Sequence, residues 1–233
     1  MSGSDLVSVV LPVFAQESFI ADVAEEYVAA LDNLRRPFEL ILVVNGRPVD
    51  DSLSVCRALA ETHPSVRVVA TERGGWGWAV RQGLAASRGD LLCYTNSART
   101  TAQDLVLHLL CAVAFPGRVI KANRKIRDNA LRRIGSLGYN VLCRALFDLP
   151  WWDVNGTPKV FPRSFSPLVA LTRDDDLIDL EFSVICRRER YPMLEIPAFS
   201  TRRHGGASTT GFTSALRLYL GALRLRGRLG GSR

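Results

Sequence analysis

The first half of the sequence alternates short apolar runs with stretches of helical pattern, and this alternation limits the fold more than any other feature. Apolar runs of strand length occupy residues 6–13, 38–44, 66–70 and 90–94. Helical patterns follow them near residues 17–34, 50–62, 76–87 and 101–114. Strands that alternate with helices build a mostly parallel sheet with helices on both faces. The pattern therefore predicts an α/β, Rossmann-like fold that binds its ligands at the carboxyl ends of the strands.

The second half is less regular and ends in a basic helix. We expect a helix over 126–147, a loop leading into a strand over 151–161, a helix over 176–188 and a strand over 193–199. Residues 200–211 are rich in Gly, Ser and Thr and predict a mobile loop. Residues 212–228 predict an amphipathic helix that suits either a membrane surface or the core of its own domain. We therefore expect one domain over 1–211, followed by a basic amphipathic helix and tail over 212–233.

Basic residues gather in two segments of a chain whose net charge is +7. Residues 118–133 hold seven Lys and Arg against one Asp, and 212–233 hold five Arg and no acid. Such segments indicate a phosphate-bearing ligand or an anionic surface. Nucleic acid is not an expected partner, because the segments lack interleaved aromatic residues and match no known binding module.

Cysteine usage and hydropathy suggest the cellular setting. The five cysteines are scattered without a C-x-x-C pair, which predicts reduced thiols in a cytoplasmic protein. The first apolar run has no basic region or cleavage site beside it, so we interpret it as a buried strand rather than a signal peptide. No run of about 18 apolar residues predicts a membrane span. We expect a cytoplasmic protein that could lie peripherally at the inner membrane face.

Six sequence pieces, in order along residues 6–211, resemble one enzyme family. They are SVVLPVFAQES, FELILVVNGRPVDD, RGGWGWAVRQGLAASRGDLL, LRRIGSLGYNVLCRAL, the D-x-x-G of residues 153–156 and the R-x-x-G-x-S of residues 203–208. Together they resemble the family 2 glycosyltransferases of the GT-A fold, within them the dolichyl-phosphate mannose synthase, or polyprenyl-phosphate glycosyltransferase, branch. The third piece is the closest match to the family's G-x-G-x-A-x-R-x-G block.

The resemblance implies an inverting transferase that moves a sugar from a nucleotide-diphosphate donor to an acceptor. A lipid phosphate of the polyprenyl-phosphate kind is the implied acceptor, and a soluble small molecule fits almost as well. The residues that fall at donor-binding positions are Pro12, Phe14, Gln16, Asn45, Gly77, Arg81, Thr95, Asn96 and Ser97. The alternative is a non-catalytic module of the same fold that binds a nucleotide, a lipid phosphate or a protein partner.

Two departures from the family pattern affect recognition of the base and of a metal. Val44 and Asn45 fall where two aspartates usually recognise the base, so either Asn45 alone reads the ring or the base differs. Residues 95–97 replace the family's metal-binding D-A-D with Thr-Asn-Ser. Neutral oxygens bind divalent cations poorly without a carboxylate. The sequence therefore predicts no D-x-D metal site and names no metal-binding residue, and it leaves Mg²⁺ or Mn²⁺ open as a cofactor.

An arginine falls where this branch often has a metal-ligating glutamine. Charge builds on the diphosphate as it leaves, and guanidinium groups can stabilise that charge as a metal does. We predict that Arg99, with Arg203 from the 200–211 loop, performs this catalytic task. The alternative interpretation of Arg99 is a solvated loop residue.

A helix face is predicted to bind the acceptor phosphate. Arg132, Ser136 and Asn140 follow the i, i+4, i+8 spacing and share that face. The full predicted acceptor-phosphate site is Arg124, Arg132, Ser136, Asn140 and Ser208. The alternative is a polar face in contact with water. A phosphate acceptor is already ionised and needs no strong base.

A hydroxyl acceptor would need a carboxylate to deprotonate it. Asp153, in the D-x-x-G piece, is the first candidate for this catalytic base, and Asp179 and Glu181 are alternatives. His204 could contact phosphate from the basic loop, although a single loop histidine is more often incidental. Four tryptophans could stack on a sugar or line a lipid groove, although packing is their commoner role: Trp76, Trp78, Trp151 and Trp152.

Overall fold

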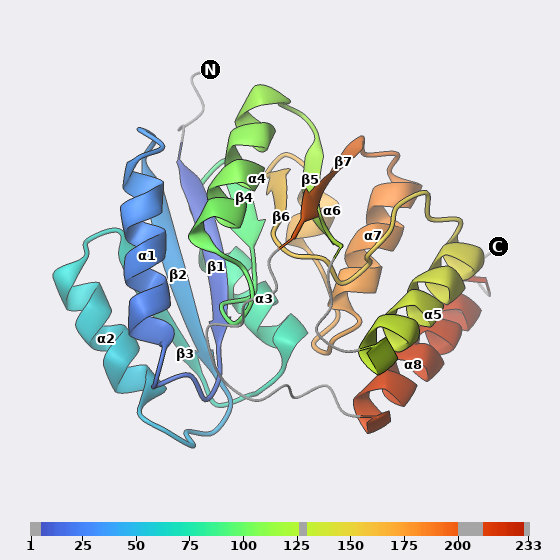
Figure 1. Cartoon of the computed structure of the whole chain (residues 1–233), viewed down its shortest axis with the longest axis horizontal. Coiled ribbons are helices and arrows are strands. Elements are labelled where there is room, and N and C mark those ends of the chain that lie inside the picture. Colours follow the sequence, from blue (N-terminus) through green and yellow to red (C-terminus); the bar gives the residue numbers. More distant parts are fainter. Residues whose placement is uncertain (1–5, 126–129, 200–211, 231–233) are drawn as a thin grey trace.

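The protein is described by a computed structural model that covers residues 6–125, 130–199 and 212–230. Its centre is a seven-stranded sheet of order β3-β2-β1-β4-β6-β5-β7 (Figure 1). The strands are β1 Val7–Val13, β2 Phe38–Asn45, β3 Val66–Thr71, β4 Leu91–Tyr94, β5 Val119–Arg124, β6 Lys159–Pro162 and β7 Met193–Ala198. β1 to β4 pair in parallel, β6 runs antiparallel to β4 and β5, and β7 is parallel to β5.

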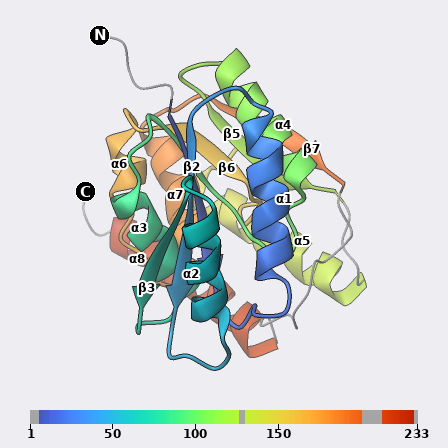
Figure 2. The ribbon, with the colours of Figure 1, turned by 90° about the vertical axis from the view of Figure 1, so that its left-hand side faces the viewer.

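Helices cover both faces of this sheet, as the alternating pattern predicts. α1 Ile20–Asp32, α2 Ser52–Thr62 and α4 Ala102–Ala114 pack on one face. α3 Trp76–Ala86, α6 Ser166–Val169 and α7 Ile178–Arg188 pack on the other. Figure 2 shows α1 and α4 on one side of the sheet and α3, α6 and α7 on the opposite side. The predicted fold class is therefore confirmed.

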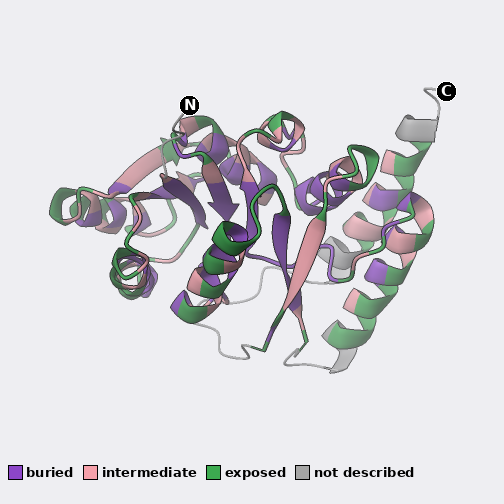
Figure 3. Cartoon of the chain, turned by 90° about the horizontal axis from the view of Figure 1, so that it is seen from above, coloured by how far each residue is buried: buried purple, intermediate pink, exposed green. Residues whose placement is uncertain are grey.

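A pair of helices forms a third layer beside the sheet. α5 Ala130–Phe147 and the C-terminal α8 Phe212–Gly230 lie side by side in Figures 1 and 3. They share a small core in which the rings of Tyr139 and Tyr219 meet edge to face at 5.6 Å. Leu177 and Leu180, at the start of α7, join that core. The C-terminal helix predicted from the sequence is present, and it is packed against the domain through part of its surface.

One strand was not expected from the sequence. Residues 119–124 form β5, although the sequence analysis read 118–133 as a basic patch. Lys121 is 1% exposed and forms an ion pair with Glu195 of β7, and Arg124 pairs with Asp153. The basic patch is therefore wrong for these two residues, because acids distant in the sequence neutralise them inside the fold.

Candidate functional site

The turn after β4 is held together by neutral side chains. Thr95 Oγ1 lies 2.7 Å from Thr100 Oγ1, and Ser97 Oγ donates to Gln16 Oε1 over 2.6 Å. Asn96 Oδ1 accepts the backbone N–H of Ala98. Thr95 and Ser97 are buried. The structure thus brings together four of the predicted donor-binding residues, Gln16 and 95–97, at the carboxyl edge of the sheet.

These oxygens do not fit a divalent cation. They are neutral and bonded to one another, whereas Mg²⁺ and Mn²⁺ prefer carboxylate, carbonyl and water ligands. Within residues 6–125, 130–199 and 212–230, no group of three or more His, Cys, Asp and Glu side chains could hold a metal ion. The turn therefore provides no carboxylate cradle of the D-x-D kind.

Arg99 lies in the same turn, half-buried, and its backbone N–H donates to the carbonyl of Asn96 at 3.4 Å. The fold thus brings this guanidinium-bearing residue to the edge of the sheet where ligands bind in α/β folds. Its action on a leaving diphosphate stays a prediction. Arg203, His204 and Ser208 lie outside the described residues.

Asn45 ties together the ends of two strands and the start of α3. Its Nδ2 donates to the carbonyl of Val13 at 3.0 Å, and its Oδ1 accepts the N–H of Gly75 at 3.1 Å. The residue is 6% exposed. These bonds give Asn45 a structural task at this edge, and contact with a base stays a prediction.

Two other predicted donor residues, Pro12 and Phe14, have opposite environments. Pro12 is buried inside β1, beyond the last pair that β1 makes with β4, Val10 with Tyr94. It can therefore lie in an inner strand without removing a ladder hydrogen bond on that side. Its contact with the donor stays a prediction. Phe14 is 45% exposed and lies against Gly46, so it presents an aromatic surface at the end of β1.

Arg81 and Arg73 share the carboxylate of Asp174. Each guanidinium bonds to a different carboxylate oxygen, and both lie near the ring of Trp78, at 4.4 Å for Arg73 and 5.6 Å for Arg81. The aromatic face favours the cations. Two guanidinium groups with one carboxylate leave a net positive charge beside the start of α3. Asp174 and Arg73 have no counterpart among the predicted site residues.

The Cα of Gly77 faces protein rather than open space, and its role in donor binding stays a prediction. A Cβ at this position would lie 2.5 Å from the carbonyl oxygen of Arg173 and 2.6 Å from that of Asp175. The backbone N–H of Trp78 donates to the carbonyl of Asp174 at 2.9 Å. The glycine therefore lets residues 173–175 lie directly on the first turn of α3.

The loop 172–177 is held in place by hydrogen bonds to Glu181 of α7. The Glu181 carboxylate accepts the backbone N–H groups of Thr172 and Arg173 at 2.9 to 3.0 Å. Glu181, considered as an alternative catalytic base, thus binds loop backbone. The signal for this loop in the sequence is its run of three aspartates after an arginine, which the sequence analysis did not use.

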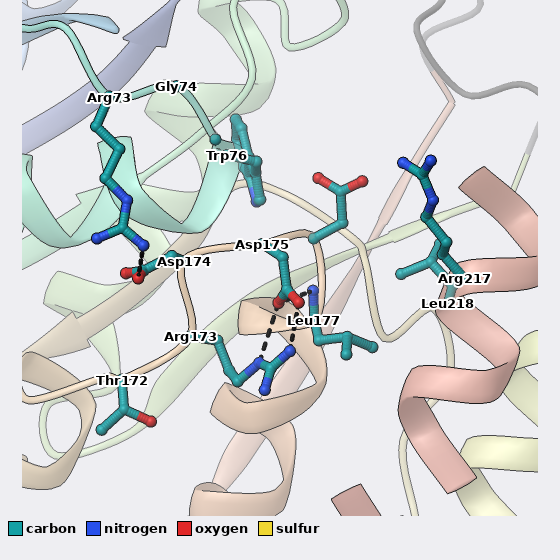
Figure 4. A pocket seen from close by; sticks show the side chains of 12 residues that line it. Arg73, Gly74, Trp76, Thr172, Arg173, Asp174, Asp175, Leu177, Arg217 and Leu218 are labelled. Carbon is teal, nitrogen blue, oxygen red and sulfur yellow. Dashed lines mark hydrogen bonds and ion pairs between the residues drawn. The ribbon is translucent and has the colours of Figure 1, made fainter. Parts of the chain in front are cut away.

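A cleft of about 760 Å³ opens between the start of α3, the loop 172–177 and α8. Figure 4 shows Trp76 and Arg217 on opposite sides of it, with the loop that carries Asp175 and Leu177 between them. Its walls are formed by residues 73–76, residues 172–177, Arg217 and Leu218.

Trp76 is held by a buried network at the back of this cleft. Its indole N–H donates to Asp179 Oδ2 at 3.2 Å. The other carboxylate oxygen of Asp179 accepts the Tyr94 hydroxyl at 2.9 Å and pairs with Lys159. Burial lowers the pKa of Lys159 to about 8, against the charge of Asp179, which raises it. Asp179, an alternative catalytic base in the sequence analysis, is 4% exposed and bonded to three side chains.

Asp153 and Arg124, predicted as catalytic base and phosphate ligand, bind each other. Asp153 Oδ2 lies 2.7 Å from Arg124 Nε, and Oδ1 lies 2.8 Å from Nη2. Burial would lower the pKa of Arg124, but the charge of Asp153 outweighs it and raises that pKa. A guanidinium beside a carboxylate favours the charged form, which makes a poor proton acceptor. The geometry therefore corrects both roles: the pair holds the D-x-x-G turn against β5.

Asn140 anchors the same turn from α5. Its Oδ1 accepts the backbone N–H of Val154 at 2.8 Å, and its Nδ2 donates to the carbonyl of Ser136 at 2.8 Å. Asn140 is 6% exposed, so its predicted contact with an acceptor phosphate is wrong. Ser136 is half-buried on α5, and the side chain of Arg132 lies outside the described part of the chain.

Comparison with known proteins identifies the class to which this fold and edge belong. The model of glycosyl transferase family 2 matches residues 8–151, so the chain belongs to that family. This confirms the resemblance read from the sequence. An undecaprenyl-phosphate 4-deoxy-4-formamido-L-arabinose transferase from Pseudomonas aeruginosa is 38% identical over 173 residues, which cover 73% of this chain and 51% of that protein. One of the same name from Pseudomonas fluorescens is 28% identical over 203 residues, with 85% and 59% covered. The chain thus spans about half the length of these curated relatives.

Solved structures share the fold at lower identity. Glucosyl-3-phosphoglycerate synthase from Mycobacterium tuberculosis, in complex with Mn²⁺, UDP and phosphoglyceric acid, superposes with a TM-score of 0.72. The identity is 21%, over 95% of this chain and 78% of that chain. This similarity establishes the GT-A architecture and no more.

Proposed function

We propose that this chain is a glycosyltransferase that moves a sugar from a nucleotide-diphosphate donor to a phosphate-bearing acceptor of the polyprenyl-phosphate kind. The observation that carries the proposal is the Arg73–Asp174–Arg81 group, a net positive site beside the glycine-rich start of α3. Family membership and the names of the relatives support the reaction class and the acceptor.

Arginines are proposed to stabilise the leaving diphosphate. Arg73 and Arg81 on one side, and Arg99 after β4, offer planar cations that can bind phosphate oxygens at two points. Fixed cations near the developing charge lower the barrier without reorganisation. The turn after β4 supplies no carboxylate for a metal, so this proposal does not place a D-x-D-bound cation there.

The reaction follows from an acceptor that is already ionised. An oxygen of the acceptor phosphate attacks the anomeric carbon on the face opposite to the nucleoside diphosphate. The new C–O bond forms as the bond to the diphosphate oxygen breaks, and its electron pair leaves with the diphosphate. One displacement inverts the configuration. No protein base is needed, which agrees with the pairing of Asp153 to Arg124.

The α5–α8 pair is proposed to bring the enzyme to a membrane surface where such an acceptor lies. Large apolar side chains are exposed along both helices: Ile134, Leu137, Val141, Leu216, Leu220 and Leu223. Arg217, Arg224 and Arg226 on α8 are exposed as well. Figure 3 shows exposed residues along the outer sides of both helices. Exposed apolar side chains on a helix that also carries arginines favour the headgroup region of an anionic bilayer. Within the described residues, no helix has the length and apolarity that a membrane span requires.

A transfer assay tests the proposal. The purified chain is incubated with undecaprenyl phosphate in detergent and with UDP-, GDP- and dTDP-linked sugars, and products are read by mass spectrometry. The proposal expects a glycosylated lipid phosphate with one of these donors, and strongly reduced turnover in Arg81→Ala. Donor binding without any product would instead favour the non-catalytic module, for which the missing carboxylates after β4 are the supporting observation. Product only with soluble phosphate esters would overturn the lipid acceptor and keep the reaction class.

A further inference from the structure

Trp76 is the residue in this cleft that the transferase resemblance does not explain. It lies at the first position of α3, between Gly75 and Gly77. Its N–H end is bonded to Asp179, and its ring meets Tyr94 edge to face at 6.4 Å. Asp179, Tyr94 and Lys159 behind it are each 4% exposed or less. The indole is therefore held rigidly from behind, while the residue lines the open cleft in front.

The order of residues along the sheet edge indicates which part of a donor would meet this ring. Phe14 lies against Gly46 at the ends of β1 and β2, and a Cβ at Gly46 would be 3.6 Å from Gly74 Cα. Gly74 is followed within two residues by Trp76, and preceded by Arg73 of the guanidinium pair. Arg73 and Trp76 line the same cleft, so a donor with its base at Phe14 and its diphosphate at Arg73 and Arg81 has Trp76 available to contact its sugar.

Charged side chains surround Trp76 in the cleft. Asp174, Asp175 and Asp176 line it, together with Arg73, Arg173 and Arg217. Carboxylates accept hydrogen bonds from hydroxyl groups, and guanidinium groups donate them. A rigid aromatic ring beside such acceptors suits a ligand with an apolar C–H face and a rim of hydroxyls, which is the chemistry of a sugar ring.

We propose that Trp76 is the specificity-determining wall for the transferred sugar and that Asp179 is a positioning residue that fixes its indole. This inference rests on the proposed function and deepens it. The buried ion pair with Lys159 and the Tyr94 hydroxyl hold Asp179, so the ring cannot rotate without breaking the N–H bond. The sugar would then be selected by how its C–H face matches a fixed surface.

Calorimetry that separates the sugar from the nucleotide tests the proposal. The affinities of UDP-glucose, GDP-mannose and dTDP-glucose are measured, and those of UDP, GDP and dTDP in parallel. The affinity of each nucleotide sugar divided by that of its nucleoside diphosphate, here called the sugar ratio, gives the contribution of the sugar. In Trp76→Ala, the ratio for the preferred pair is expected to fall about 3- to 10-fold, the range of a single aromatic contact. The exposed Trp152, which is not among the residues of the cleft, gives the control Trp152→Phe, expected to leave the ratio unchanged.

The positioning role of Asp179 has its own readout. The indole N–H resonance of Trp76 is assigned by its loss in Trp76→Phe. Asp179→Asn is expected to shift that resonance and to lower the sugar ratio as Trp76→Ala does. A merely structural Asp179 would lower the thermal midpoint and leave both unchanged. Because Asp179→Asn strands Lys159 in the interior, Asp179→Asn with Lys159→Met is the second variant, with the same expectation.

The outcomes separate this inference from the proposed function. Nucleotide sugars that bind with the same sugar ratio in wild type and Trp76→Ala overturn the role of Trp76 and leave the transferase intact. Equal weakening of diphosphate and nucleotide sugar also overturns it, because the ring would then contact the nucleotide. No binding of any nucleoside diphosphate overturns the proposed function, and this inference with it.

Discussion

At the scale of single residues, a glycine can mark a position where two backbone segments pack so closely that a Cβ would not fit. Gly77→Ala would place a methyl group 2.5 Å from the carbonyl oxygen of Arg173, and backbone cannot move aside as a flexible side chain does. We expect a loss of about 1–3 kcal/mol in the free energy of unfolding, measured by urea denaturation. Gly135→Ala on α5 is the control. It has no neighbour within 4 Å and should be neutral or stabilising by about 0.5–1 kcal/mol. Equal stability of both variants would contradict the close contact.

His108 links stability to pH through burial. It is fully buried on α4, with Nδ1 2.6 Å from the carbonyl of Asp104, and its Nε2 has no hydrogen-bond partner among the described residues. Burial lowers the pKa of His108 below its ordinary value. At mildly acidic pH the unfolded chain therefore binds a proton at His108 more readily than the folded chain does. The contribution of neutral, buried His108 to the free energy of unfolding is complete above about pH 6.5, the ordinary histidine pKa. It is lost as the pH falls below that value.

The expected result is a free energy of unfolding that decreases from pH 7.5 to pH 5, with a smaller decrease in His108→Leu. His63→Leu, at the half-exposed end of α2, is the control and should retain the slope of the wild type. A slope that His108→Leu leaves unchanged would show that other groups cause it.

Single residues also show where sequence reasoning fails. The sequence predicts a catalytic base in the D-x-x-G turn and a phosphate-binding face in the Arg-x-x-x-Ser-x-x-x-Asn helix. In the fold, Asp153 pairs with Arg124 and Asn140 binds the Val154 N–H, so both pieces secure one turn. A recurring motif in a sequence identifies residues under constraint, but the partners that explain the constraint lie 14 to 29 positions away. Spacing alone cannot supply those partners.

At the scale of elements, the acidic loop 172–177 controls the charge beside α3. Asp174 neutralises part of the positive charge of Arg73 and Arg81, and 28% of its side chain is exposed. Asp174→Asn should strengthen binding of UDP or another nucleoside diphosphate by about 3- to 10-fold at low salt, because both guanidinium groups then face the ligand with full charge. Asp148→Asn removes an exposed ion pair with Arg187 and serves as the control. Weaker diphosphate binding in Asp174→Asn would contradict a role for this guanidinium pair.

Elements also divide what the sequence can predict from what it cannot. The strands β1 to β4 are short apolar runs that alternate with helical patterns, and all four were predicted. β5 was not predicted because Lys121 and Arg124 interrupt the apolar pattern of a buried strand. Their charges can be buried because they pair with Glu195 and Asp153, which are distant in the sequence. The cleft was not predicted because it forms where the start of α3, the loop 172–177 and α8 meet. The amphipathic pattern of α8 predicts the helix but not the elements beside which it lies.

At the scale of the whole molecule, the α5–α8 pair should determine attachment to membranes. Leu216→Gln with Leu223→Gln removes two exposed apolar side chains of α8, at 52% and 48% exposure. We expect weaker co-sedimentation with phosphatidylglycerol vesicles, by roughly 10-fold or more, because a bilayer would bury the exposed half of each leucine. We expect little change with phosphatidylcholine vesicles. Leu107→Gln with Leu110→Gln on α4 is the matched control, at 45% and 50% exposure. Equal loss in both pairs would show that no single surface meets the lipid.

The central claim concerns how the whole edge of the sheet binds a nucleoside diphosphate with arginines where its family relatives would be expected to use a carboxylate-bound metal. Calorimetric titration with UDP, GDP, dTDP and CDP, each with Mn²⁺ and again with EDTA, tests it most directly. The account predicts that one of them binds, that EDTA leaves its affinity within about twofold, and that Arg81→Ala or Arg99→Ala weakens it by about 10-fold or more. Binding that requires Mn²⁺ and is indifferent to both arginines would contradict it.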